Sequence, residues 1–90
     1  HDELREKTIE EPDEIWRSND LAGNTLVTFV KQFDEGENDG TWYIAVTAED
    51  EASSSHALLF SFPTKDENLV DRYRHGENLQ AEEVTQEASH

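Results

Sequence analysis

The seven residues from Thr41 to Thr47, Thr-Trp-Tyr-Ile-Ala-Val-Thr, constrain the fold more than any other part of the chain. The run consists mainly of β-branched and aromatic residues, which are enriched in strands. Two more apolar runs flank it, at 25–33 before it and at 57–62 after it. We therefore expect an interior strand in the middle of an antiparallel sheet.

The N-terminal part predicts a short helix followed by a first strand. Asp2 suits an N-cap, and acids precede bases through residues 2–9, as the helix dipole favours. Pro12 ends this helix, and residues 14–18 have the composition of a strand. The next expected strand, 25–33, has apolar residues at both its odd and its even positions, so both of its faces are partly apolar. We expect one of its faces to pack against a helix and the other to be covered by aromatic residues or to line a groove.

The C-terminal part predicts a fourth strand and a second helix. The strand covers residues 56–62 and is stopped by Pro63. Thr64, with Glu67 three residues later, has the capping-box pattern of a helix N-terminus, and Gly76 suits the end of that helix. The pattern as a whole predicts the α+β class.

The expected architecture is a four-stranded antiparallel β-meander with an N-terminal helix and a short C-terminal helix. Ninety residues allow one hydrophobic core. We expect residues 1–80 to form a single α+β domain and residues 81–90 to form a flexible acidic tail.

Composition excludes several classes of protein. The chain has no cysteine, which excludes disulfides, thiolate catalysis and cysteine-based metal sites and favours an intracellular protein. No apolar run approaches the roughly 18 residues that a membrane helix needs, and none has the pattern of a signal peptide. We therefore expect a soluble, cytoplasmic protein that does not bind a membrane.

The charge balance is 7 basic residues against 22 acidic ones, a net charge of −15. Such a charge opposes non-specific binding to a phosphate backbone, because that binding depends on Lys and Arg. Three interpretations remain: adaptation to a high-salt cytoplasm, a solubility-driven acidic surface with a hidden site, or a surface that imitates nucleic acid and binds a basic partner. Having only three lysines favours the first of these over the second.

Metal sites find little support in the sequence. The acidic loop at 34–40 offers oxygen ligands, but an EF-hand loop needs Gly at its sixth position and Glu at its twelfth, where this chain has Asp39 and Ala45. The four histidines lack the spacing of a metal site. We interpret the loop as an acidic hairpin turn, and we expect no metal and no cofactor.

The candidate site residues are a histidine and three of the scarce cations. His56, at the start of a strand, can act as an acid or base near neutral pH. Arg17 and Lys31 lie within expected strands, and Arg74 lies at an expected helix end. If these four side chains converge, they form a cationic pocket that could hold a phosphate group. The alternative is that each cation pairs with a neighbouring carboxylate.

Two segments carry a family resemblance: Ile-Glu-Glu-Pro-Asp-Glu-Ile-Trp at 9–16, and Phe-Pro-Thr at 62–64 leading to Tyr-Arg-His-Gly at 73–76. Over most of residues 3–79 the chain resembles the small nuclease-like domains of phage head-associated and polymorphic-toxin proteins, which are grouped with the barnase, EndoU, colicin and RelE ribonucleases. The resemblance implies an N-terminal helical part on a four-stranded antiparallel sheet and metal-independent RNA cleavage. The catalytic positions that it implies are Thr64 and Arg74, with His56, Lys31 and Arg17 as further candidates.

Three hypotheses of function follow. The first is a nuclease-like domain that cleaves RNA by attack of the 2′-hydroxyl group. The second is an acidic interaction module, such as an immunity protein, an antitoxin or a nucleic-acid mimic, that binds a basic protein. The third is a structural domain without a site. The mimic predicts carboxylates arranged along one face and no cationic pocket, and the nuclease predicts the reverse.

Overall fold

The computed structural model describes residues 2–34, 36–50, 52–53 and 55–79, so the predicted tail at 81–90 lies outside the described residues. The elements in chain order are α1 (Asp2–Glu10), β1 (Glu14–Asn19), β2 (Thr25–Phe33), a 3₁₀ turn η1 (Gly36–Asn38), β3 (Thr41–Asp50), β4 (Ser55–Thr64), α2 (Glu67–Asp71) and β5 (Glu77–Asn78). The α+β class and the N-terminal helix are confirmed. None of the helices in the described residues has the length and apolar character needed to span a membrane.

The sheet is antiparallel and has five strands in the order β4-β3-β2-β1-β5. The central prediction is confirmed, because the run at 41–47 lies in β3, between β2 and β4. The predicted number of four strands is wrong. The fifth strand, β5, pairs with Trp16 and Arg17 on the outer side of β1. It has only two residues, too few for any period-2 pattern to indicate a strand.

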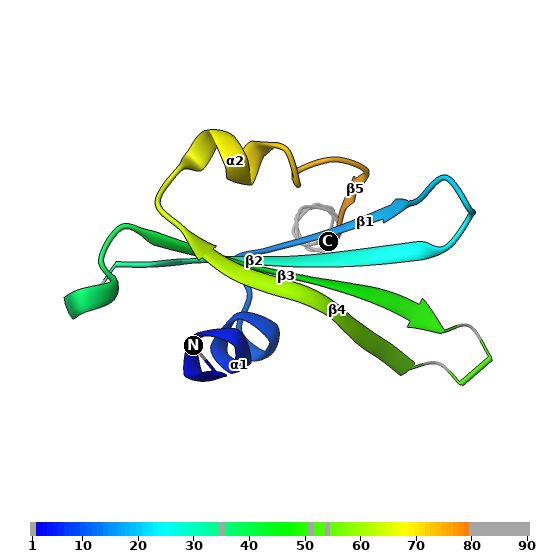
Figure 1. Cartoon of the computed structure of the whole chain (residues 1–90), viewed down its shortest axis with the longest axis horizontal. Helices are drawn as coiled ribbons and strands as arrows, with labels where there is room; N and C mark the ends of the chain where they lie inside the picture. Colours follow the sequence, from blue (N-terminus) through cyan, green and yellow to red (C-terminus); the bar gives the residue numbers. More distant parts are fainter. Residues whose placement is uncertain (1, 35, 51, 54, 80–90) are drawn as a thin grey trace, which may run out of the picture.

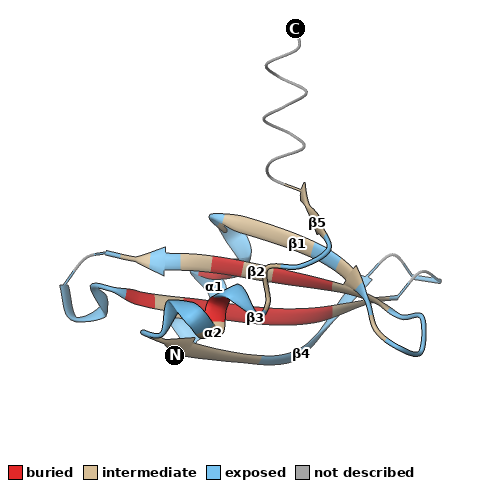
Figure 2. Ribbon diagram, turned by 90° about the horizontal axis from the view of Figure 1, so that it is seen from above, coloured by how far each residue is buried: buried red, intermediate tan, exposed pale blue. Residues whose placement is uncertain are grey.

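The two helices lie on opposite sides of the sheet (Figure 1). The core lies between the sheet and α2, where Val30, Ile44, Val46 and Val70 are buried. Aromatic side chains complete this face: Trp16, Trp42, Phe62 and Tyr73. The expectation that aromatic residues cover one face of residues 25–33 is therefore confirmed. Burial is concentrated in β2 and β3 (Figure 2).

Helix α1 packs on the other face of the sheet. Its buried residue is Thr8, whose hydroxyl donates a 2.7 Å hydrogen bond to the carbonyl oxygen of Leu4. Tyr43 is buried on this face, and its hydroxyl lies 2.9 Å from the hydroxyl of Ser61. The hydrogen-bonded hydroxyl of Thr8 lets a polar residue occupy this buried position.

Helix α2 begins later than the sequence predicts, so the N-cap at Thr64 is wrong. Thr64 is still paired with Trp42 in β4, and the chain needs two more residues to leave the sheet. Asp66 caps the helix instead, its side chain accepting a 3.0 Å hydrogen bond from the backbone N–H of Asn68. The hydroxyl of Thr64 supports this turn by accepting a 3.1 Å hydrogen bond from the N–H of Asp66. Pro63 lies inside β4 rather than after it.

The turn between β1 and β2 is held by a single carboxylate. Asp20 accepts hydrogen bonds from the backbone N–H groups of Asn24 (2.8 Å) and Ala22 (2.9 Å). These bonds, that of Asn24 above all, hold the pKa of Asp20 below its ordinary value. Gly23 lies in the same turn with φ +88°, a conformation that favours glycine.

Candidate functional site

The five predicted site residues are divided between the two faces of the sheet. The strand register places three of them on the α1 face: Arg17, Lys31 and His56. Their side chains point to the same side of the sheet as Val27 and Tyr43, away from the α2 core. Thr64 pairs with Trp42, and both point to the α2 face. Arg74 also contacts Trp42. The sheet itself separates the two groups, so the four candidate cationic side chains do not meet in one pocket.

Arg74 is held by three carboxylates on the α2 face. Its guanidinium binds Glu14 through two hydrogen bonds, of 2.9 and 2.8 Å, and binds Asp71 at 2.6 Å and Glu67 at 3.4 Å. The guanidinium carbon also lies 4.9 Å from the ring centroid of Trp42. The hydrogen bonds to Glu14 raise the pKa of Arg74 above its ordinary value, although burial acts in the opposite direction. Arg74 therefore has a structural partner for most of its donors.

Lys31 and Arg17 are also paired. The Nζ atom of Lys31 donates a 2.8 Å hydrogen bond to the carbonyl oxygen of Glu11 and lies 3.8 Å from Oδ1 of Asp13. Arg17 forms an ion pair with Glu77, so the pair joins β1 to β5. Each of the three strand or helix-end cations considered from the sequence thus lies beside a carboxylate, which is the alternative that the sequence analysis left open.

His56 and Arg17 border one shallow hollow of about 270 Å³ on the α1 face. His56 pairs with Glu49 across β4 and β3, so that carboxylate lies at the same end of the hollow. The other lining residues are mostly apolar: Ile15, Val27, Phe29 and Leu79. This hollow combines an imidazole, a guanidinium and a carboxylate over an apolar floor, and it is the place where two predicted site residues lie together.

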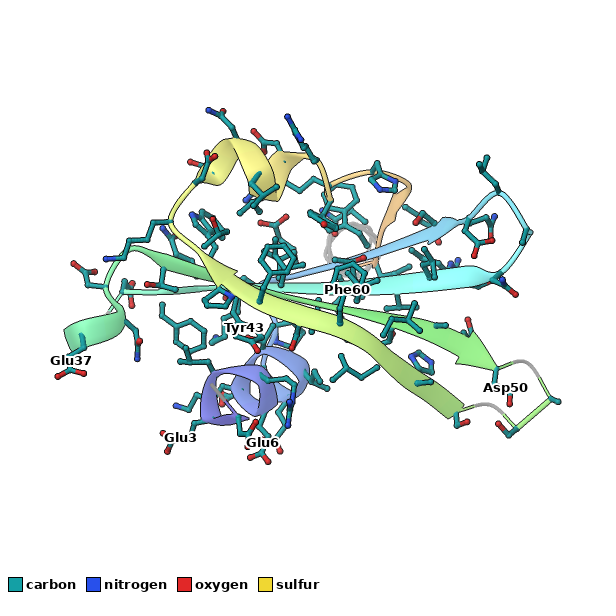
Figure 3. The ribbon with its side chains drawn as sticks, viewed as in Figure 1. Glu3, Glu6, Glu37, Tyr43, Asp50 and Phe60 are labelled. Carbon is teal, nitrogen blue, oxygen red and sulfur yellow. The ribbon has the colours of Figure 1, made fainter. Side chains whose placement is uncertain are left out.

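Helix α1 and the loop after β2 meet at a hollow that has both an acidic and a basic lining residue. Glu3, Lys7, Phe33 and Asn38 line one hollow, so the N-terminal helix and the loop lie side by side there. Glu3 and Glu6 project from α1, and Glu37 projects from the tip of the loop (Figure 3). Across the described ranges, no group of three or more His, Asp and Glu side chains is arranged to hold a metal ion.

The exposed side chains of β4 were not predicted from the sequence. Leu58, Leu59 and Phe60 are 42%, 53% and 45% exposed, although they lie in a strand that the sequence predicts. A signal was present, because residues 52–64 contain no Asp, Glu, Lys or Arg in a chain that is 32% charged. That pattern is shared by buried strands and unprotected edge strands, and only the strand order shows that β4 is an edge.

Comparison with known proteins gives no match: no family model, no curated protein and no solved structure is significantly similar to this chain.

Proposed function

We propose that this chain is an acidic interaction module that binds a basic protein partner. The observation that carries the proposal is that Arg17, Lys31 and Arg74 are each paired with carboxylates of the chain itself. These cations are therefore engaged, and the chain as a whole retains a net charge of −15. Such a surface repels a phosphate backbone and attracts a cationic protein over a long range.

The exposed carboxylates are arranged to support this proposal. Four acidic residues of α1 are exposed, Asp2, Glu3, Glu6 and Glu10, and of these Asp2 pairs with Arg5 of the same helix. The adjacent loop adds the exposed acids Asp34, Glu37 and Asp39. A partner with lysines or arginines on one face could contact both elements, because they border the same hollow.

The test is a binding titration with a defined basic probe. We expect a fluorescently labelled oligolysine peptide to bind the full chain, with an affinity that falls as salt rises from roughly 50 to 200 mM, because screening weakens charge attraction. A peptide with glutamine in place of each lysine is the control and should not bind. Equal binding of the two peptides, or none of either, contradicts the proposal.

A second candidate function is metal-independent RNA cleavage. The observation that favours it is the hollow that Arg17 and His56 line from strands β1 and β4, since an imidazole and a guanidinium in one hollow are suited to acid–base chemistry on a phosphate. The chain would be incubated with a mixed RNA pool in the presence of a chelator. Cleavage that His56→Ala abolishes and His75→Ala preserves supports this candidate. RNA that stays intact with the unaltered chain contradicts it.

A further inference from the structure

Strand β4 is an edge strand with an unusual composition. It is ten residues long and pairs with β3 on one side, and no other strand of the described residues pairs with its outer side. Edge strands of soluble proteins are commonly protected by charged side chains, because their unpaired N–H and C=O groups can bind another strand. Residues 55–64 carry no Asp, Glu, Lys or Arg. One of the usual protections of an edge, a charged side chain, is therefore missing from β4.

The opposite edge of the sheet differs from β4. It is formed by β5, which has two residues, Glu77 and Asn78, and whose glutamate is paired with Arg17. A very short edge strand that carries a charge offers little backbone for a new strand. An extended partner therefore has one long edge available in the described sheet, the outer edge of β4.

The two faces beside β4 have different chemistry. On the α2 face Phe60 and Phe62 stack with centroids 6.2 Å apart, and Tyr73 packs edge-on against both. Phe60 remains 45% exposed, so this aromatic cluster is open toward the outer edge. On the α1 face, Glu49 pairs with His56 of β4, Leu58 is 42% exposed, and the exposed Glu3 and Glu6 of α1 point away from the sheet (Figure 3). A strand added to β4 would have an aromatic cluster on one side, and on the other a face with carboxylates at Glu49 and on α1.

We propose that the outer edge of β4 binds an extended protein segment in which apolar and basic residues alternate. Successive side chains of a strand point to opposite faces, so the apolar ones would contact Phe60 and the basic ones would lie on the α1 face, which carries Glu49 and the exposed acids of α1. The backbone of the segment would pair with the free N–H and C=O groups of β4. This proposal rests on the proposed function and adds to it the site and the form of the basic partner.

A second copy of the chain fits this edge less well. Two antiparallel β4 strands related by a two-fold axis in one continuous sheet would place both α1 helices on the same side of that sheet. The exposed acids of α1 would then lie near one another, on two chains that each carry a net charge of −15. Like charges brought together in this way oppose association. A basic segment brings the opposite charge to the same place.

Two features limit where the segment can pair. Leu59 is the extra residue of a bulge, because Phe60 pairs with Val46 while Leu58 pairs with Thr47. Pro63 lacks a backbone N–H near the end of the strand. We therefore expect pairing along residues 55–58 and 60–62, on either side of the bulge.

The test compares two labelled peptides with the same side chains. One has ten residues, the length of β4, with valine and lysine alternating. The other has the same sequence with alternate backbone nitrogens methylated, which removes N–H donors and keeps the charge. Fluorescence anisotropy with the full chain should show that the first peptide binds at least about tenfold more tightly, because the methylated peptide loses several backbone hydrogen bonds to β4.

Two exposed leucines provide a matched pair of protein variants. Leu58→Lys places a cation on the α1 face of β4, beside the lysines of the peptide, and should weaken binding about fivefold through cross-strand repulsion. Leu21→Lys makes the same change of charge in the turn between β1 and β2, where Leu21 is fully exposed, and should change binding far less. Circular dichroism would confirm that both variants fold.

The outcomes separate the site from the function. Equal binding of the two peptides, or equal effects of the two variants, would overturn the β4 site and leave the proposed function standing. Absence of binding by both peptides and by oligolysine would overturn both proposals. A concentration-dependent dimer in sedimentation that Leu58→Lys dissociates would assign the edge to a second copy and overturn the basic segment.

Discussion

Arg74 joins segments that are far apart in the sequence. Its guanidinium binds Glu14, sixty residues earlier, and the same Glu14 side chain accepts a 2.9 Å hydrogen bond from the indole N–H of Trp16. The arginine and Glu14 side chains are 20% and 21% exposed, so both charges are largely removed from water. A carboxylate in such a position needs a partner that supplies several donors in a plane, which arginine does and lysine does not.

Substitutions of Arg74 test this pairing. Arg74→Met leaves the half-buried carboxylate of Glu14 without its main partner and should lower the free energy of unfolding by about 2 kcal/mol. Arg74→Lys keeps the charge and loses the two-pronged contact, so we expect about half that loss. Urea denaturation of the three proteins measures both values. A loss below about 0.5 kcal/mol in the methionine variant would contradict the structural role.

The sequence could indicate that Arg74 needs an explanation and could not supply it. A cation at an ordered helix end in an acidic chain points to a site or to an ion pair, and composition cannot decide between them. The decision depends on β1 lying beside the end of α2, a contact between segments that no local pattern encodes. His56 shows the same limit, since strand order and register decide that it lines the same hollow as Arg17.

At the scale of elements, β5 depends on one glycine. Gly76 has φ +91°, and a Cβ at that position would overlap the carbonyl oxygen of Arg17 on β1. From the sequence alone, this glycine is expected at a helix end. The structure shows that α2 ends at Asp71, and that Gly76 instead allows the chain to approach β1 closely enough for β5 to pair. The longer strands were predictable because eight or more residues with β propensity indicate a strand whatever conformation a single residue such as a glycine adopts.

Gly76→Ala should therefore be strongly destabilising, by about 2 to 3 kcal/mol, because backbone strain and a backbone clash add together. Gly23→Ala is the matched control. It has a similar φ of +88° but no neighbouring heavy atom within 4 Å of the added carbon, so it should lose only about 1 kcal/mol. Thermal unfolding followed by circular dichroism compares the two. Equal losses would show that close packing against β1 is unimportant.

At the scale of the whole molecule, net charge opposes the fold. Twenty-two acidic residues and seven basic ones share a chain of 90 residues. Several of the cations are already paired with carboxylates. The exposed carboxylates of α1 and of the loop after β2 therefore repel one another. Repulsion of this kind destabilises a compact state and is reduced by screening.

Salt should therefore stabilise the free protein. We expect the melting temperature to rise by several degrees as sodium chloride increases from about 0.01 to about 0.5 M, because the Debye length shortens from about 30 Å to a few ångströms. The effect should shrink near pH 4.3, the isoelectric point, where there is little net charge to screen. A melting temperature that falls with salt at pH 7 would show that the ion pairs outweigh the repulsion.

The most direct test of the account is amide hydrogen exchange, measured by NMR on the full chain with and without the alternating valine and lysine peptide. The account predicts that bound peptide slows exchange of outward-facing amides within residues 55–62, while the amides of β5 and of the loop after β2 change little. Slowed exchange confined to α1 and that loop would contradict the β4 site and leave the acidic interaction module standing, and an unchanged β4 at saturating peptide would likewise contradict the β4 site.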